Sequence, residues 1–186
     1  MTRDQLEHII RASADITDQY EFVVIGSQSI LGAVPRPDAA FTASMEADIY
    51  PKERPELADK IDGAIGEGSL FHETHGYYAQ GVGPETAVLP NDWQERVERI
   101  QNEGTRGRLA ICLSLPDLFL SKAAANRDKD REFCMALLEH RYVRVAEAIN
   151  LVPRMPLDAP AQRDMRARIR RWADAVRRAG HDIEGG

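Results

Sequence analysis

The sequence predicts an α+β (α/β) protein, a mixed sheet flanked by helices with a helical C-terminal part. Two short apolar runs, residues 21–25 and 41–50, end at Gly26 and Pro51 and are typical of strands. Helical periodicity appears between these runs and dominates from Pro116 onward. Strands and helices that alternate early in a chain, followed by helices alone, indicate an α/β body with a helical extension.

In the first part of the chain each element has its own local pattern. Residues 3–16 place apolar side chains at helical spacing, and residues 21–25 form a β-branched run. Residues 28–33 predict a short helix that stops before two prolines, and residues 41–50 predict a second strand. Residues 55–66 carry apolar side chains at i, i+4 and i+8, which predicts an amphipathic helix.

The remaining part becomes progressively helical. Aromatic residues and glycines over residues 69–90 predict a hairpin-like segment, and the apolar run 109–115 predicts another strand. Helices follow at residues 117–126, 129–150 and 161–179. We therefore divide the chain into an α/β core over 1–115 and a helical part over 116–186.

The composition is that of an ordinary folded protein, with 186 residues, 43% hydrophobic, 29% charged and a net charge of −6. This negative charge differs from the basic surface of a dedicated duplex-DNA binder. Cys112 and Cys134 fall in different elements and form no metal-binding motif, so we expect two reduced core residues. The N-terminus lacks the apolar segment of a signal peptide and no stretch is long enough to span a membrane, so we expect a cytoplasmic protein without a membrane partner.

A Gly26-Ser27 turn follows the first predicted strand and precedes a predicted helix. Glycine allows close approach of a ligand to the backbone, and the N–H groups that begin a helix favour a phosphate. The hydroxyl of Ser27 adds a donor or a helix cap. By itself the pattern is equally typical of an ordinary turn.

Two acids, Glu46 and Asp48, lie in the second predicted strand. Side chains alternate across a strand, so both carboxylates project from one face. Like charges on one face repel unless they are solvated or bridged by a cation, and a hard divalent ion is the usual bridge. The alternative is an exposed strand face with two solvated acids.

Together these features resemble the signature of the DNA polymerase β-like minimal nucleotidyltransferase superfamily: an apolar strand, Gly26-Ser27, a short helix, and then Glu46-x-Asp48 on the next strand. A later stretch, residues 115–130 (LPDLFLSKAAANRDKD), looks like the helix pattern of a prokaryotic branch. That branch includes toxins of toxin–antitoxin and abortive-infection systems. The resemblance covers about residues 20–140.

The resemblance implies a metal-dependent enzyme that transfers a nucleoside monophosphate from an NTP to an RNA, protein or small-molecule acceptor, with a cognate antitoxin as a candidate partner. Glu46 and Asp48 would be the catalytic residues and would hold Mg²⁺ or Mn²⁺. The residues implied in nucleotide binding are Gly26, Ser27, Lys122 and Arg127. For the last two, a solvated charged helix is the alternative interpretation.

Enzymes of the superfamily carry a third carboxylate on a later strand, which activates the acceptor hydroxyl. The segment over residues 69–90 offers Glu73, Gln80 and Glu85 for this position, and the sequence does not choose among them. If Gln80 stands there, the general base is missing and a degenerate binding or regulatory module becomes the alternative function. The superfamily more commonly has aspartate at the position of Glu46. A glutamate there has a longer side chain but the same charge.

Overall fold

The computed structural model describes residues 1–183, so three residues of the predicted helical part, 184–186, lie outside the described chain. The chain divides into two compact units. Unit 1 comprises Met1–Ala87 and Val97–Ser114, and unit 2 comprises Val88–Arg96 and the chain from Leu115 onward. Within residues 1–183, no helix combines the length and the apolar character needed to cross a membrane.

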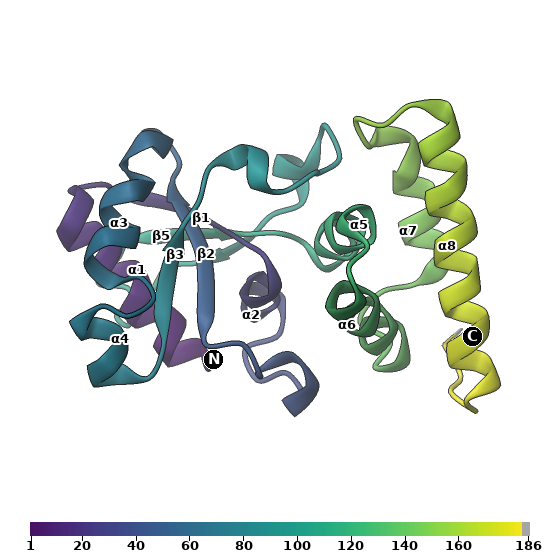
Figure 1. Cartoon of the computed structure of the whole chain (residues 1–186), viewed down its shortest axis with the longest axis horizontal. Helices are drawn as coiled ribbons and strands as arrows, with labels where there is room; N and C mark the ends of the chain where they lie inside the picture. The colour runs from purple at the N-terminus through teal and green to yellow at the C-terminus, as the bar shows by residue number, and fades with distance from the viewer. Residues whose placement is uncertain (184–186) are drawn as a thin grey trace. The chain divides into compact units, whose positions relative to one another are not determined.

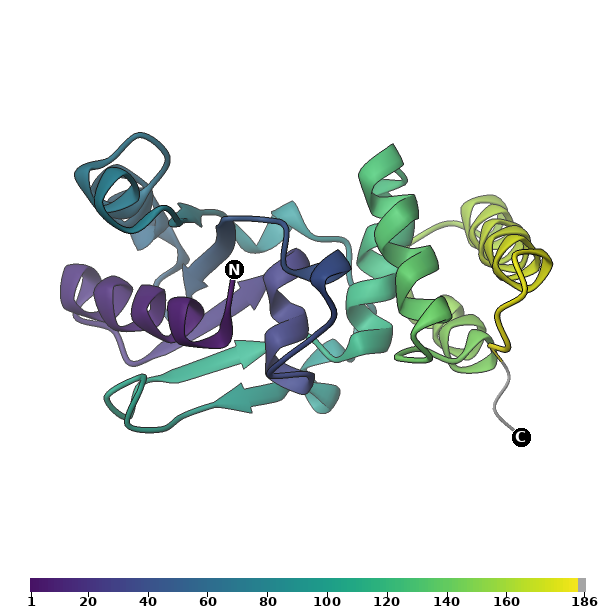
Figure 2. The ribbon, with the colours of Figure 1, turned by 90° about the horizontal axis from the view of Figure 1, so that it is seen from below.

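Unit 1 is built on a mixed sheet, so the predicted fold class is confirmed. Its strands are β1 Glu21–Ile25, β2 Glu46–Pro51, β3 Tyr78–Gly81, β4 Glu98–Ile100 and β5 Leu109–Cys112. Among the described residues they lie in the order β3-β2-β1-β5-β4. β1 pairs antiparallel with β2 and parallel with β5, while β3 pairs parallel with β2. The antiparallel β4–β5 pair is visible as the teal hairpin in Figure 2.

Helices cover this sheet and close its core (Figure 1). Their bounds are α1 Arg3–Thr17, α2 Ile30–Ala33, α3 Ala58–Ile65 and α4 Leu70–His75. α3 packs on β3 and β2, α1 packs on α3 and β2, and α2 packs on β5 and β4. Thr2 starts α1 with a capping box that includes Gln5, and the apolar face of α1 is fully buried through Leu6, Ile9 and Ile10.

The strands over residues 21–25 and 41–50 were predicted to be neighbours, and this is confirmed, although β2 begins only at Glu46. The hairpin-like segment predicted over 69–90 is wrong. Ser69 accepts a hydrogen bond from the His72 backbone and starts α4, and Gly76 ends α4 in the left-handed conformation (φ 74°). β3 then pairs with β2 rather than with a strand of its own segment.

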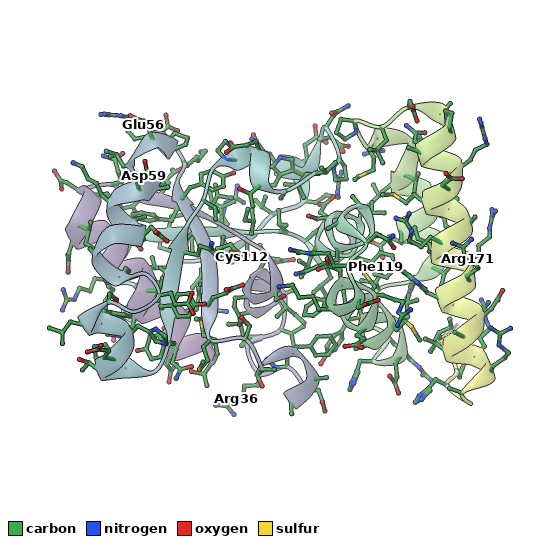
Figure 3. The ribbon with its side chains drawn as sticks, viewed as in Figure 1. Arg36, Glu56, Asp59, Cys112, Phe119 and Arg171 are labelled. Atoms are coloured by element: carbon green, nitrogen blue, oxygen red, sulfur yellow. The ribbon has the colours of Figure 1, made fainter. Side chains whose placement is uncertain are left out.

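Unit 2 is helical. Its helices are α5 Leu115–Ala125, α6 Asp128–Glu139, α7 Val145–Leu151 and α8 Ala159–Arg178. The single helix predicted over 129–150 is two helices, because Arg141 between α6 and α7 adopts a positive φ of 58°. α5 packs on α6 and α7, and α8 packs on α6. Phe119, labelled on α5 in Figure 3, and Trp172 of α8 contribute to this core.

Residues 88–96 belong to unit 2 because charged contacts hold them there. The Arg96 guanidinium donates to the fully buried carboxylate of Asp117 on α5 at 2.8 Å and also pairs with Asp92. Hydrogen bonds from Arg96 and Arg154 hold the pKa of Asp92 at about 2 despite partial desolvation. The two cysteines are buried and free, as predicted, with Cys112 on β5 in unit 1 and Cys134 on α6 in unit 2.

Candidate functional site

The turn after β1 depends on a glycine. Gly26 has φ 69° and ψ −166°, a combination that is essentially restricted to glycine. The chain then enters a short 3₁₀ turn, Ser27–Ser29, which leads into α2. Ser27 is half-buried at the start of this turn. The local sequence therefore produces a sharp strand-to-helix reversal, as predicted.

The turn and the acidic strand come together, because the antiparallel pairing of β1 and β2 places Ile25 opposite Asp48. A β-carbon built on Gly26 would lie 1.9 Å from Oδ2 of Asp48, so this carboxylate lies directly against the glycine backbone. Glu46 and Asp48 are both half-exposed, two positions apart on β2, and they share one face of the strand. Gly26 and the two carboxylates thus form one cluster within unit 1.

Tyr78 of β3 joins this cluster. Parallel pairing of β2 and β3 puts it beside Glu46, and its hydroxyl donates a hydrogen bond of 3.0 Å to Oε2 of Glu46. Partial burial raises the pKa of Tyr78 to about 12, together with this bond and the negative charges of Glu46, Glu67 and Asp48. The phenol therefore remains a donor throughout the neutral pH range.

The same pairing identifies the residue next to Asp48. Gln80 of β3 is in register with Asp48, so the two side chains project from one face, and Gln80 is exposed. Glu73 lies on α4, and Glu85 lies in a 3₁₀ turn, Pro84–Thr86, beyond β3. In residues 1–183 no group of three or more His, Cys, Asp or Glu side chains is arranged to hold a metal ion. The residue of β3 in register with Asp48 is therefore an amide and not a carboxylate.

Glu46 and Asp48 nevertheless fit a divalent ion of the hard type. Mg²⁺ is commonly held by one or two protein carboxylates, with substrate phosphates and water completing its coordination. The donor set on β2 is consistent with that arrangement, since it offers two half-buried carboxylates on one face of the strand. The two carboxylates would supply only part of the coordination of the ion, and the phosphates of a bound nucleotide would supply the rest.

Lys122 and Arg127 lie in unit 2, and both contact the fully buried carboxylate of Asp130 on α6. Nζ of Lys122 is 3.3 Å from Oδ1 of Asp130, and Nε of Arg127 is 2.6 Å from Oδ2. Lys122 is buried, whereas the side chain of Arg127 is 60% exposed. Asp130 is therefore an ion-pair partner within unit 2, and of the two cations Arg127 is the more accessible to a ligand.

A mixed sheet with a Gly-Ser turn against an acid-x-acid strand defines a protein of the nucleotidyltransferase class. A family model described as "Nucleotidyltransferase of unknown function (DUF6036)" matches residues 4–144, and the chain belongs to this family. The match includes the Gly26 turn, both acids of β2, and the segment that carries Lys122 and Arg127. Searches of curated proteins and of solved structures gave no match.

Three further residues lie beside the cluster: Tyr78, His72 and Glu67. The sequence offered Tyr78 as a ring that stacks on a base or packs in the core, His72 as a surface residue or one that supports the site, and no role for Glu67. The ring of His72 packs on Tyr78, and the negative charge of Glu67 acts on the Tyr78 hydroxyl. Their positions depend on which strand pairs with β2, a contact between residues about thirty positions apart. In the sequence, these residues are linked only by their proximity: Glu67 precedes α4, His72 lies in it and Tyr78 follows it.

Proposed function

We propose that this chain transfers a nucleoside monophosphate from an NTP to an acceptor. The observation that carries the proposal is the contact between the Asp48 carboxylate and the Gly26 turn, in a chain of a nucleotidyltransferase family. In the reaction an acceptor oxygen attacks the α-phosphorus, a new P–O bond forms, and the bond to pyrophosphate breaks. Pyrophosphate leaves with the electron pair of that bond, and the proton of the acceptor hydroxyl passes to solvent.

Residues of the cluster have separate roles in this proposal. Glu46 and Asp48 hold the divalent ion, and the backbone of the Gly26-Ser27 turn, against which the Asp48 carboxylate lies, binds the triphosphate. Mg²⁺ or Mn²⁺, when bound, supplies neutralisation of the phosphate charge. Transfer of this kind depends mostly on positioning and on electrostatic stabilisation, which two carboxylates and a backbone turn can provide.

The acceptor in this proposal is an RNA, a protein or a small molecule. The resemblance of residues 115–130 to toxin components extends it to the toxin side of a toxin–antitoxin pair, with a cognate antitoxin as partner. Arg127, exposed on unit 2, would support nucleotide phosphates, and Lys122 would act mainly by holding Asp130.

A second function is favoured by one observation, the register of Gln80 with Asp48. A neutral amide cannot take a proton from an acceptor hydroxyl, so the chain would then bind nucleotides without transferring them. Such a chain would act as a binding or regulatory module.

Purified protein incubated with labelled NTPs, Mg²⁺ or Mn²⁺, and total cellular RNA and protein tests both functions. Transfer of label that is abolished in Asp48→Asn supports the enzyme, because the substitution removes charge and keeps shape. Equal transfer by Asp48→Asn would place the chemistry elsewhere. NTP binding with no transfer to any acceptor would favour the binding module instead.

A further inference from the structure

The hydrogen bond between Tyr78 and Glu46 is a specific feature of this site that the proposed reaction does not use. Both residues lie in regular strands, and the parallel register fixes their α-carbons side by side. The Tyr78 hydroxyl is 3.0 Å from Oε2 of Glu46. The backbone N–H of Tyr78 also donates to the Met45 carbonyl at 3.0 Å, which anchors β3 at the start of β2.

The ring of Tyr78 packs against His72 of α4. The rings of His72 and Tyr78 lie 4.6 Å apart between their centroids, tilted by 49°. Nδ1 of His72 accepts a hydrogen bond of 3.1 Å from the Gly68 backbone, which places the ring proton of neutral His72 on Nε2. Ser69 caps the same helix through the His72 backbone N–H at 3.2 Å. One hydrogen bond therefore fixes the His72 ring and another fixes its backbone.

A hydrogen bond that fixes the carboxylate orientation should strengthen metal binding more for a glutamate than for an aspartate. Glu46 has one more rotatable bond than Asp48, so its carboxylate has more orientations to lose when it binds an ion. A hydrogen bond from outside the ligand set reduces that loss and fixes which oxygen remains open. Groups of this kind typically change metal affinity or activity by 10–100-fold when they are removed.

We propose that Tyr78 is a positioning residue that orients the Glu46 carboxylate for a divalent cation, and that His72 holds Tyr78 in place. This role rests on the proposed function, because it requires that Glu46 binds the ion. Tyr78 leaves Oε1 of Glu46 for the cation and does not itself contact the reacting atoms. A tyrosine suits the task because its protonated hydroxyl can only donate to a carboxylate.

The test is the Mn²⁺ affinity of Tyr78→Phe, measured by isothermal titration and by electron paramagnetic resonance, with Mn²⁺ alone and with a non-hydrolysable NTP. Removal of the hydroxyl keeps the ring against His72, so the fold should persist and the Mn²⁺ dissociation constant should rise about tenfold. His72→Phe, which keeps a ring but loses the Gly68 bond, should give a smaller increase in the same direction.

Tyr77→Phe is the matched control. It removes the same atom from the adjacent residue, whose hydroxyl instead contacts Nδ1 of His8 at 2.7 Å. Mn²⁺ affinity should remain at the wild-type value in this control, and both variants should be folded by circular dichroism. Wild-type affinity in Tyr78→Phe would overturn the positioning role alone. Absence of Mn²⁺ binding in the wild-type protein, with and without nucleotide, would overturn the proposed function and this role with it.

Discussion

Oδ2 of Asp48 lies where a β-carbon of residue 26 would have to be, 1.9 Å from its ideal position on Gly26. The glycine is therefore required twice, once for its backbone conformation and once for the space that the carboxylate takes. This joins two motifs that are 22 positions apart in the sequence. Neither motif is specific alone, but their contact is what makes the cluster a candidate site.

Gly26→Ala should impair both stability and metal binding. The residue would be forced into a conformation that costs about 1–3 kcal/mol for a non-glycine residue, and the new methyl group would displace the Asp48 carboxylate. Urea unfolding and Mn²⁺ titration measure the two effects. Gly107→Ala is the control, since Gly107 has φ 74° but nothing within 4 Å of an added β-carbon. It should lose stability and keep Mn²⁺ affinity, and equal Mn²⁺ loss in both variants would contradict the steric account.

Gln80→Asp should add the carboxylate that the strand face lacks. Gln80 is in register with Asp48, so an aspartate there would complete a set of three acids and could accept a proton from an acceptor hydroxyl. We expect transfer to hydroxyl acceptors to increase by about 100-fold, the lower end of the range for general-base catalysis. Gln80→Asn, which has the shape of aspartate without its charge, is the control. Equal rates in the two variants would show that position 80 does not face the acceptor.

The parts of the site that follow from local chemistry could be predicted from the sequence. A β-branched run closed by glycine identifies β1, and the period of two along a strand puts Glu46 and Asp48 on one face. The contact of Tyr78 with Glu46 could not be predicted, because it requires the knowledge that β3 pairs parallel with β2. Gln80 could be considered as a candidate but not chosen for the same reason.

Segments with competing local signals were the ones assigned wrongly. Residues 69–90 contain aromatic residues and glycines that favour a hairpin, yet Ser69 caps α4 and Gly76 ends it. β4 was not predicted, since Glu98–Ile100 is only three residues long and two of them are exposed. Its formation depends on antiparallel pairing with β5, which a local pattern does not show.

The free energy of unfolding of unit 1 should decrease as the pH falls, because His8 becomes protonated more readily in the unfolded chain. Burial lowers the pKa of His8 below its ordinary value of 6.5, and the positive charges of Arg11, His75 and Arg106 lower it further. The unfolded chain therefore takes up this proton before the folded chain does. The contribution is fully present above about pH 6.5 and is lost as the pH falls below that value.

Urea unfolding at several pH values checks this linkage, and His8→Phe isolates it. The phenylalanine ring keeps the packing against Phe71, whose centroid is 5.1 Å from that of His8, but carries no titrating group. The variant should be less stable at neutral pH, because it loses the contact with Tyr77, and its stability should depend less on pH between about 7 and 5. An unchanged pH dependence would assign the acid sensitivity to other groups.

Arg127→Gln should distinguish a nucleotide-binding role in unit 2 from a structural one. Burial alone would raise the pKa of Asp130, but the hydrogen bond from Arg127 and the charge of Lys122 outweigh it, and the pKa is lowered. Lys122 is buried against Asp130, with Nζ also 5.4 Å from the Phe133 ring centroid. Lys122→Met would leave the buried carboxylate with less compensation and should cost about 3 kcal/mol, so it cannot isolate a ligand effect.

Arg127→Gln removes one partner of the buried Asp130 carboxylate but leaves Lys122 beside it, so the variant should be destabilised and still remain folded. If Arg127 contacts nucleotide phosphates, this variant should bind a fluorescent NTP about tenfold more weakly, the loss of one charge-assisted hydrogen bond of about 1.5 kcal/mol. Arg131→Gln, at an exposed position of the same helix α6, should bind as the wild type does. Equal nucleotide affinity in both variants would leave Arg127 with the structural role alone, as a partner of Asp130 at the start of α6.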